Sequence, residues 1–336
     1  MAVDGAARTG AQVADGFRHE VALYRGLADL ARVVLPFIRE GVARREPVMV
    51  AMVPERLELL EHALGADATR VDFVDMAELG ANPACIIPEW RRFLEDTSDL
   101  GPVRGVAEPV WQGRRPVELV ETELHEALLN VAFDGGPPWR LLCPYDLTAL
   151  PGPVVDDAVR HHPHVYPPAA EGHDTTPGAG SSSARRTFQE LLPPAPGHAT
   201  RLAFHDGGLA ALRRRVRDLA DGAGLARSGR DNLVLAVHEL AANSILHAGG
   251  GGVLTSWRQP DALVVEVRDR GHIEDALVGR GPLDLEAENG RGIWIANQLC
   301  DLVQVRSGPD GTQVRLWTWV EQGQWSATTN VDAEAR

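Results

Sequence analysis

Short apolar runs alternate with helical patterns through the first half of this 336-residue chain, and this alternation restricts the folds open to it. A strand buried on both faces reads as a continuous apolar run. Strand, helix, strand, repeated, is typical of a parallel sheet with right-handed crossovers. The predicted strands are 47–53, 71–76, 103–108 and 139–143, and the predicted helices between and around them are 27–40, 54–64, 86–95, 117–133 and 154–162. We also expect 17–24 to open a helix.

The chain then changes character. Residues 166–197 are rich in Pro, Gly and Ser, which argues against a packed core and predicts a flexible linker with a short helix near 185–192. After it, strand-like and helical patterns predict helices on one face of a mostly antiparallel sheet, an α+β two-layer sandwich. The expected organisation is a disordered N-terminus (1–16), an α/β domain (17–165), the linker (166–197), the α+β domain (198–322) and a tail (323–336).

Composition excludes several classes of function. The formal net charge of −14 argues against direct binding of nucleic acid or of an anionic membrane. The three cysteines, Cys85, Cys143 and Cys300, are far apart and predict neither a zinc site nor a disulfide framework. Because no apolar run reaches membrane-spanning length and residues 1–16 lack the apolar segment of a signal peptide, we expect a soluble cytoplasmic protein.

One polar stripe in the second half carries chemistry. Glu239, Asn243 and His247 follow each other at spacings of four residues on a predicted helix over 230–247. An amide oxygen is a suitable ligand for Mg²⁺, and a carboxylate can accept a proton from a hydroxyl group. Taken alone, the stripe also fits a solvated helix face.

Two glycine-containing segments follow the stripe. Asp269 and Gly271 end a predicted strand over 262–268, where the carboxylate could accept a hydrogen bond from an exocyclic amine and glycine would let a base approach the backbone. Gly290, Arg291 and Gly292 open a predicted helix, whose free N–H groups suit phosphate. Ordinary turns would explain either segment by itself.

In this order the segments resemble the ATP-binding superfamily of gyrase, histidine kinases and MutL (GHKL, the Bergerat fold), and especially the anti-sigma-factor serine-protein kinases. The matching pattern runs from Glu239 to His247, through Asp269-x-Gly271 and Gly290-Arg291-Gly292, to Gly311-Thr312. The resemblance implies ATP and Mg²⁺ as cofactors. It makes Glu239 the catalytic base, Asn243 the Mg²⁺ ligand and Asp269 the adenine-reading group. His247, Gly271, Gly290, Arg291, Gly292 and Thr312 would complete the nucleotide site. Position 273 is Ile where fuller members carry Gly, and the lid segment 272–289 is short.

The first half resembles a RecA-like sensory domain called MEDS. The resemblance rests on Phe17-Arg18-His19-Glu20, Asn82-Pro83, Trp90, Glu108-Pro109 and Leu142-Cys143-Pro144-Tyr145-Asp146. It implies that this domain senses an input, such as a small-molecule ligand, and passes it to the second domain.

Together the two resemblances imply a regulator of transcription in signal transduction and stress response. It would sequester a sigma factor, and would phosphorylate a serine or threonine of a STAS-domain anti-anti-sigma factor; such sigma-binding domains also form homodimers. One alternative is a partner-binding module without catalysis. Another is a divergent sensor histidine kinase that uses His19 as phosphoacceptor.

Three further features remain open. His19 fits a buried or ligand-sensing histidine better than a phosphoacceptor. Cys143 fits either a packed core thiol or a sensor of ligand or oxidant. The run 161–164, His-His-Pro-His, could bind a metal, but no carboxylate or cysteine has suitable spacing, which favours a solvated helix end.

Overall fold

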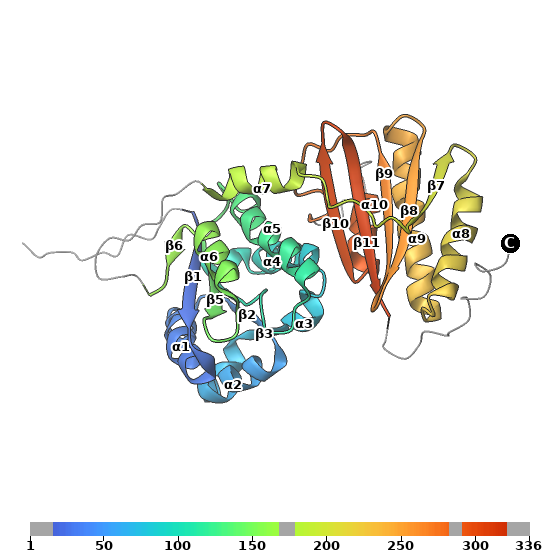
Figure 1. Ribbon diagram of the computed structural model, residues 1–336. Coiled ribbons are helices and arrows are strands. Elements are labelled where there is room, and N and C mark those ends of the chain that lie inside the picture. The colour runs from blue at the N-terminus through green and yellow to red at the C-terminus, as the bar shows by residue number, and fades with distance from the viewer. Residues whose placement is uncertain (1–15, 168–178, 282–290, 321–336) are drawn as a thin grey trace, which may run out of the picture.

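The computed structural model describes residues 16–167, 179–281 and 291–320, which form two domains side by side (Figure 1). The N-terminal domain is a six-stranded sheet in which every pair is parallel, in the order β3-β2-β4-β5-β1-β6. Its strands are β1 (Phe17–Tyr24), β2 (Val48–Met52), β3 (Asp72–Asp75), β4 (Val103–Ala107), β5 (Trp139–Asp146) and β6 (His164–Val165). Its helices are α1 (Gly26–Arg44), α2 (Pro54–Leu64), α3 (Met76–Leu79), α4 (Ile86–Asp96), α5 (Pro116–Ala132) and α6 (Gly152–His161).

The helix expected over 17–24 is wrong, because this segment is strand β1, which lies between β5 and β6. Interior strands of a parallel sheet are normally apolar, and the polar residues His19 and Glu20 interrupt the apolar pattern that would predict a strand here. Both are buried, and Arg140 of β5 donates hydrogen bonds of 2.8 and 3.0 Å to the Glu20 carboxylate. A neighbouring strand therefore supplies the partner that makes a buried charge tolerable.

Helices cover both faces of this parallel sheet. On one face α1 and α2 pack on alternate residues of the strands, including Ala22, Val50 and Leu142. On the other face α4, α5 and α6 pack on the residues between them, including Val21 and Cys143. The result is a three-layer α/β/α domain, as the strand–helix alternation predicts.

The C-terminal domain is a five-stranded sheet in the order β10-β11-β9-β8-β7, and all of its pairs are antiparallel. Its strands are β7 (Thr200–His205), β8 (Gly251–Gln259), β9 (Ala262–Asp269), β10 (Leu302–Gly308) and β11 (Gly311–Trp319). The helices α8 (Leu209–Gly222), α9 (Arg227–His247) and α10 (Arg291–Leu299) pack on one face of this sheet. This is the predicted α+β two-layer sandwich.

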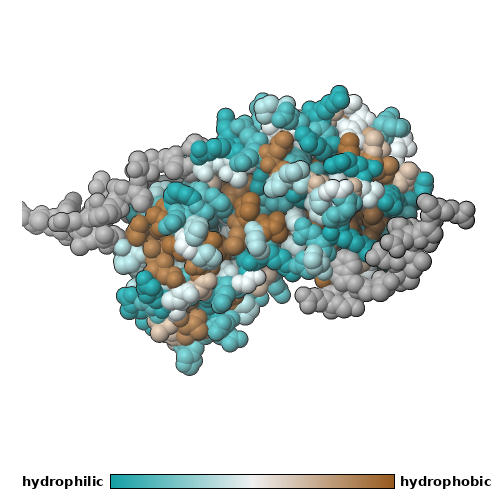
Figure 2. Space-filling view, in the orientation of Figure 1, coloured by the Kyte–Doolittle hydropathy of each residue, from teal (hydrophilic) through white to brown (hydrophobic). Residues whose placement is uncertain are grey.

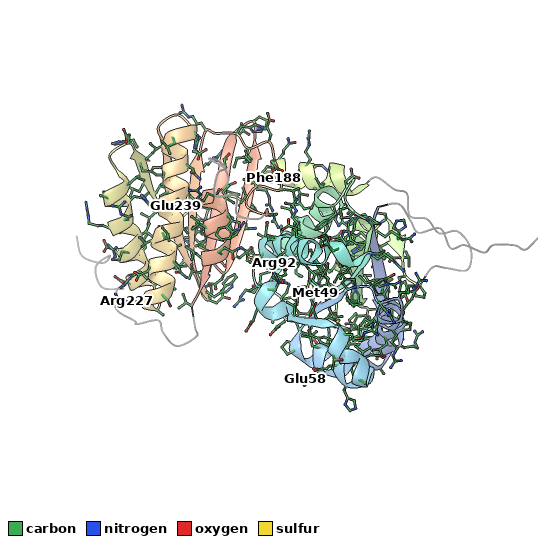
Figure 3. All side chains as sticks on the ribbon, turned by 180° about the vertical axis from the view of Figure 1, so that it is seen from behind. Met49, Glu58, Arg92, Phe188, Arg227 and Glu239 are labelled. Atoms are coloured by element: carbon green, nitrogen blue, oxygen red, sulfur yellow. The ribbon has the colours of Figure 1, made fainter. Side chains whose placement is uncertain are left out.

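A helix lies within the stretch that joins the domains. α7 (Ala179–Gln189) packs against α5 of the first domain and β10 of the second (Figure 1). Its Phe188 is only 2% exposed, and Figure 3 shows this side chain where the two domains meet. Downstream, the Pro193 carbonyl accepts a 2.7 Å hydrogen bond from Arg315 of β11. The described part of this stretch is thus attached to both domains.

Polar contacts also join the domains directly. Glu121 of α5 accepts hydrogen bonds from Arg306 at 2.5 Å and from Gln304 at 3.1 Å, both on β10. Asn82 Nδ2 donates to the carbonyl of Asn297 on α10 at 3.0 Å. Because Asn82 and Glu121 are buried, the two domains share a packed and hydrogen-bonded interface.

None of the described helices combines the length and apolarity that a membrane span requires. Figure 2 shows the hydrophobic residues of one face as separate patches among hydrophilic ones. The described residues do not include 1–15 of the expected disordered N-terminus (1–16), Gly290 or any part of the expected C-terminal tail (323–336).

Candidate functional site

The polar stripe lies on α9, whose opposite side fills the core of the C-terminal domain. Leu233, Val237 and Leu240 are at most 3% exposed, which fixes the rotation of the helix. Asn243 and Glu239 are half-buried and His247 is exposed. Figure 3 labels Glu239 on this helix. The predicted stripe therefore forms one edge of the helix, between core and solvent.

Asp269 ends β9 directly beside this edge. Ser244 Oγ donates a 2.5 Å hydrogen bond to Asp269 Oδ2, and the Gly271 N–H donates a 2.8 Å bond to Oδ1. Each carboxylate oxygen thus has one partner and keeps a second acceptor direction. Asp269 is held in one orientation and can still accept a further hydrogen bond from a ligand.

A hydrogen-bond network supports the Asp269 end from the neighbouring strand β11. Thr312 Oγ1 donates to the Gly271 carbonyl at 3.0 Å and lies 2.9 Å from Ser307 Oγ. Ser307 Oγ in turn accepts a 2.8 Å bond from the Ile273 N–H. Gly311 has φ +108°, and a Cβ there would lie 2.1 Å from the Asp269 carbonyl oxygen, so only glycine fits this turn. Thr312 therefore lies beneath the Asp269 end of the site.

The start of α10 approaches α9 closely. A Cβ on Gly292 would lie 2.4 Å from Asn243 Nδ2 and 3.4 Å from the Glu239 carbonyl oxygen. Glycine is needed here because the backbone of α10 occupies the space beside Asn243. The N-terminal end of α10 therefore lies beside the stripe.

These groups surround one cavity of about 670 Å³. That volume lies within the range of small-molecule sites. The predicted site residues that line it are Asn243, His247, Asp269, Gly271, Arg291 and Thr312. Gly292 contacts Asn243 behind the wall, while Glu239 does not line the cavity. Ile273, at the position where fuller relatives carry glycine, lines it as well.

Ser244 and Arg91 are among the residues of this cavity that the sequence did not predict. Ser244, 1% exposed, lies one position after Asn243 and is the side-chain donor to Asp269. The sequence places Ser244 one helical turn after Leu240, but nothing in it indicates contact with Asp269, which lies 25 residues further along the chain. Arg91 comes from α4 of the other domain, and its Nη1 lies 3.4 Å from where a Cβ of Gly281 would be. No local pattern could join these positions.

Two family models match the chain. Residues 18–163 match MEDS, the MEthanogen/methylotroph, DcmR Sensory domain. Residues 204–318 match the histidine kinase-like ATPase domain. The chain thus joins a part that matches the MEDS model to a part that matches the histidine kinase-like ATPase model, and these parts are named the MEDS domain and the ATPase domain. The motif order from Glu239 to Thr312 and the cavity lie within the second of these matches.

One solved structure that is similar to part of this chain is that of the RsbU and RsbW domains of a Mycobacterium tuberculosis protein. It is 19% identical, the match covers 37% of this chain and 33% of that one, and the TM-score is 0.29. The match thus spans about a third of that chain's length, and a likeness at this TM-score supports no argument about fold or function. No curated protein matches the chain.

Proposed function

We propose that this protein is an anti-sigma regulatory factor whose ATPase domain binds Mg-ATP and phosphorylates a serine or threonine of a STAS-domain antagonist. The observation that carries the proposal is the 670 Å³ cavity, which gathers the predicted nucleotide-binding residues from α9, β9, α10 and β11. The family match of residues 204–318 supports it. A protein substrate and a sigma factor are the expected partners.

Asp269 would recognise the adenine ring. Its carboxylate is fixed by Ser244 and Gly271 and has acceptor capacity left for the exocyclic amine. The cavity is also lined by the apolar side chains of Leu240, Val267 and Val314, which would contact the flat faces of the base. A base lacking that amine should therefore bind more weakly.

The phosphates would extend toward the start of α10. Arg291 lines the cavity and Gly292 keeps the helix end close to Asn243. The free N–H groups of a helix N-terminus attract phosphate oxygens. Asn243 has an amide oxygen suited to Mg²⁺ and would hold it there. When bound, Mg-ATP would supply the phosphoryl group and the cation that offsets its charge.

Glu239 would act on the substrate hydroxyl. It lies one turn before Asn243 on α9, outside the cavity wall, where the hydroxyl of a docked protein could reach it. A carboxylate there would orient the hydroxyl and accept its proton. The site thus has separate residues for nucleotide and for acceptor.

The MEDS domain is connected to this site by Arg91. This side chain comes from α4 and lines the cavity, and the segment just before α4 is hydrogen-bonded to α10 through Asn82 and Asn297. A shift of the sensory domain would therefore change both a cationic group at the nucleotide and the helix that faces the phosphates. This is the route by which the first domain would gate the second.

Phosphoryl transfer tests the proposal. The chain is mixed with labelled Mg-ATP and the STAS-domain proteins of its own genome, and acid-stable phosphate on each is counted. Glu239→Gln should reduce the rate by about 10²- to 10⁴-fold, as expected for a lost general base. Glu58→Gln, at an exposed glutamate on α2, serves as the control. No transfer by the wild type, or an equal rate in Glu239→Gln, would contradict the kinase assignment.

A second candidate is a nucleotide-dependent binding module without catalysis. It is favoured by the absence of Glu239 from the cavity wall. In that case nucleotide would still bind, and sequestration of the sigma factor would be unaffected by Glu239→Gln. The histidine kinase alternative lacks an accessible acceptor, because His19 is 1% exposed inside β1 and both of its ring nitrogens face protein groups.

A further inference from the structure

Four potential metal ligands converge inside the MEDS domain. They are His19 of β1, Glu126 of α5, Cys143 of β5 and His162, which directly follows α6. Each is at most 2% exposed, and one ligand atom from each lies within 4.8 Å of all the others. The cluster is on the sheet face that α5 and α6 cover, away from the nucleotide cavity.

Three of the distances between these atoms are close to those of a tetrahedral metal site. Glu126 Oε2 lies 3.2 Å from His19 Nε2 and 3.1 Å from His162 Nε2, and Cys143 Sγ lies 3.4 Å from His19 Nε2. With Zn–N and Zn–O bonds of about 2.0–2.2 Å and Zn–S of about 2.3 Å, ligands of a tetrahedral site are separated by about 3.3–3.8 Å. These three distances lie within a few tenths of an ångström of those values, and the remaining ligand atoms lie within 4.8 Å of one another, so small side-chain movements would let the cluster surround an ion.

The Nδ1 atoms of both imidazoles have hydrogen-bond partners outside the four ligands. His162 Nδ1 donates to the Ala158 carbonyl at 2.7 Å. His19 Nδ1 lies 3.2 Å from Asn130 Oδ1, while Asn130 Nδ2 donates to the His161 carbonyl at 2.9 Å. The amide therefore presents its oxygen to His19, so Nδ1 carries the proton. This is the arrangement that orients metal-binding histidines.

The Nε2 atoms of both rings face the centre of the cluster, where each lies close to the same carboxylate oxygen, Glu126 Oε2. A cation between the groups would be bound by both nitrogens, the carboxylate and the sulfur of Cys143 at once.

We propose that His19, Glu126, Cys143 and His162 form a zinc-type metal site in the MEDS domain. The mixed nitrogen, sulfur and oxygen donors favour Zn²⁺ or Co²⁺ over Mg²⁺ or Ca²⁺, which take oxygen ligands. Cys143 binds as thiolate and its proton passes to solvent. This inference is independent of the proposed kinase activity.

A small cavity lies beside the cluster. It has a volume of about 110 Å³ and is lined by Glu126, Tyr145 and His161 among others. Of the four ligands, Glu126 is the one that lines it, so Glu126 would be the ligand nearest to a small molecule in this cavity.

Metal titration of the full-length chain tests the site. The protein is stripped with a chelator, dialysed and titrated with Co²⁺, then with Zn²⁺. We expect one Co²⁺ per chain, intense visible bands of tetrahedral cobalt, and a near-ultraviolet band from thiolate-to-cobalt charge transfer that Zn²⁺ abolishes. Cys143→Ser should remove the charge-transfer band. Asn130→Ala, which leaves every ligand in place, should weaken Co²⁺ binding by about 10- to 100-fold.

Two variants provide controls. Cys300→Ser removes another buried thiol, in the ATPase domain, and His62→Ala removes an exposed histidine; both should retain the band and the affinity. The proposal is overturned if the wild type binds no Co²⁺ or Zn²⁺ above background. It is also overturned if binding lacks a thiolate band, or if Asn130→Ala binds as tightly as wild type. Should Cys143→Ser fail to fold, the wild-type spectrum and Asn130→Ala still decide.

Discussion

The two domains handle their polar residues in opposite ways. In the ATPase domain most of the predicted site residues line a cavity of about 670 Å³, and the four motifs come from 74 consecutive positions, 239–312. In the MEDS domain His19, Glu126, Cys143 and His162 are sealed in the interior and span 144 positions, 19–162. Open sites built from one helix edge and two turns can be recognised in a sequence. A closed cluster built from four separate elements cannot.

The largest expected effect tests whether the two domains are one cooperative unit. Glu121→Ala would leave Arg306 and the nearby Arg280 buried at the interface without their carboxylate. Breaking a buried ion pair costs about 3–5 kcal/mol in the free energy of unfolding. Urea unfolding measures it, with Glu58→Ala on the exposed side of α2 as control (Figure 3). A change below about 1 kcal/mol would mean that the interface contributes little.

The second effect concerns a buried carboxyl group in the MEDS domain. Glu108 is fully buried, pairs with Arg56 and accepts a 2.7 Å hydrogen bond from Tyr24. Burial raises its pKa from 4.5 to about 7, against the attraction of Arg56. Between these pH values the folded chain holds a proton that the unfolded chain has released. The free energy of unfolding should therefore fall as pH rises through this window, by about 3 kcal/mol at most.

Glu108→Gln separates this contribution from those of other groups. The glutamine side chain is neutral at every pH. The free energy of unfolding of this variant should therefore lack the contribution of Glu108 to the slope between pH 4.5 and 7. Glu58→Gln, at an exposed position, should keep the wild-type slope. Parallel pH profiles for wild type and Glu108→Gln would show that Glu108 titrates normally.

A third test probes the tight contact at the ATP site. Gly292→Ala would place a methyl group 2.4 Å from Asn243 Nδ2, and overpacking of this kind costs about 1–3 kcal/mol. We expect about tenfold weaker binding of Mg-ATP or more. The control Gly229→Ala lies on α9, where the nearest atom to a new Cβ is 4.0 Å away. Equal affinities in both variants would remove Gly292 from the site.

The smallest expected effect asks whether the MEDS domain reaches the nucleotide. Arg91→Ala removes a partly exposed cation from the cavity wall, worth about 0.5–1 kcal/mol, or about two- to fivefold in the Kd for ATP. Arg92→Ala is the matched control, because Arg92 pairs with Glu89 and Asp96 at the surface (Figure 3). If calorimetry finds the two variants alike, Arg91 plays no part in nucleotide binding.

Much of the fold was predictable because it depends on local patterns. Strands β2 to β5 lie at the predicted segments 47–53, 71–76, 103–108 and 139–143, and α2 begins and ends where the pattern predicts. β1 was mispredicted because His19 and Glu20 are polar, and the groups that make them acceptable in a strand are Arg140 and Asn130, more than 100 residues away. The strand's place in the sheet depends on those distant partners.

In the candidate site, too, the features that depend on local sequence patterns could be predicted and those that depend on tertiary packing could not. Asn243 and His247 share one helix edge by periodicity alone, and the Gly311 turn brings Thr312 toward Asp269. Ser244 and Arg91 were missed because their roles depend on tertiary packing. His162 was judged to lack a carboxylate or cysteine partner, whereas folding brings Glu126 and Cys143 to it from other elements.

Calorimetric titration with Mg-ATP tests the central claim most directly, namely that the cavity between α9, β9 and α10 is a nucleotide site that depends on Asn243. Wild type should bind ATP with a Kd in the micromolar range, and Asn243→Ala should bind at least about tenfold more weakly while remaining folded. Absence of binding by the wild type, or equal affinity in Asn243→Ala, would contradict the account and leave a protein-binding domain without nucleotide.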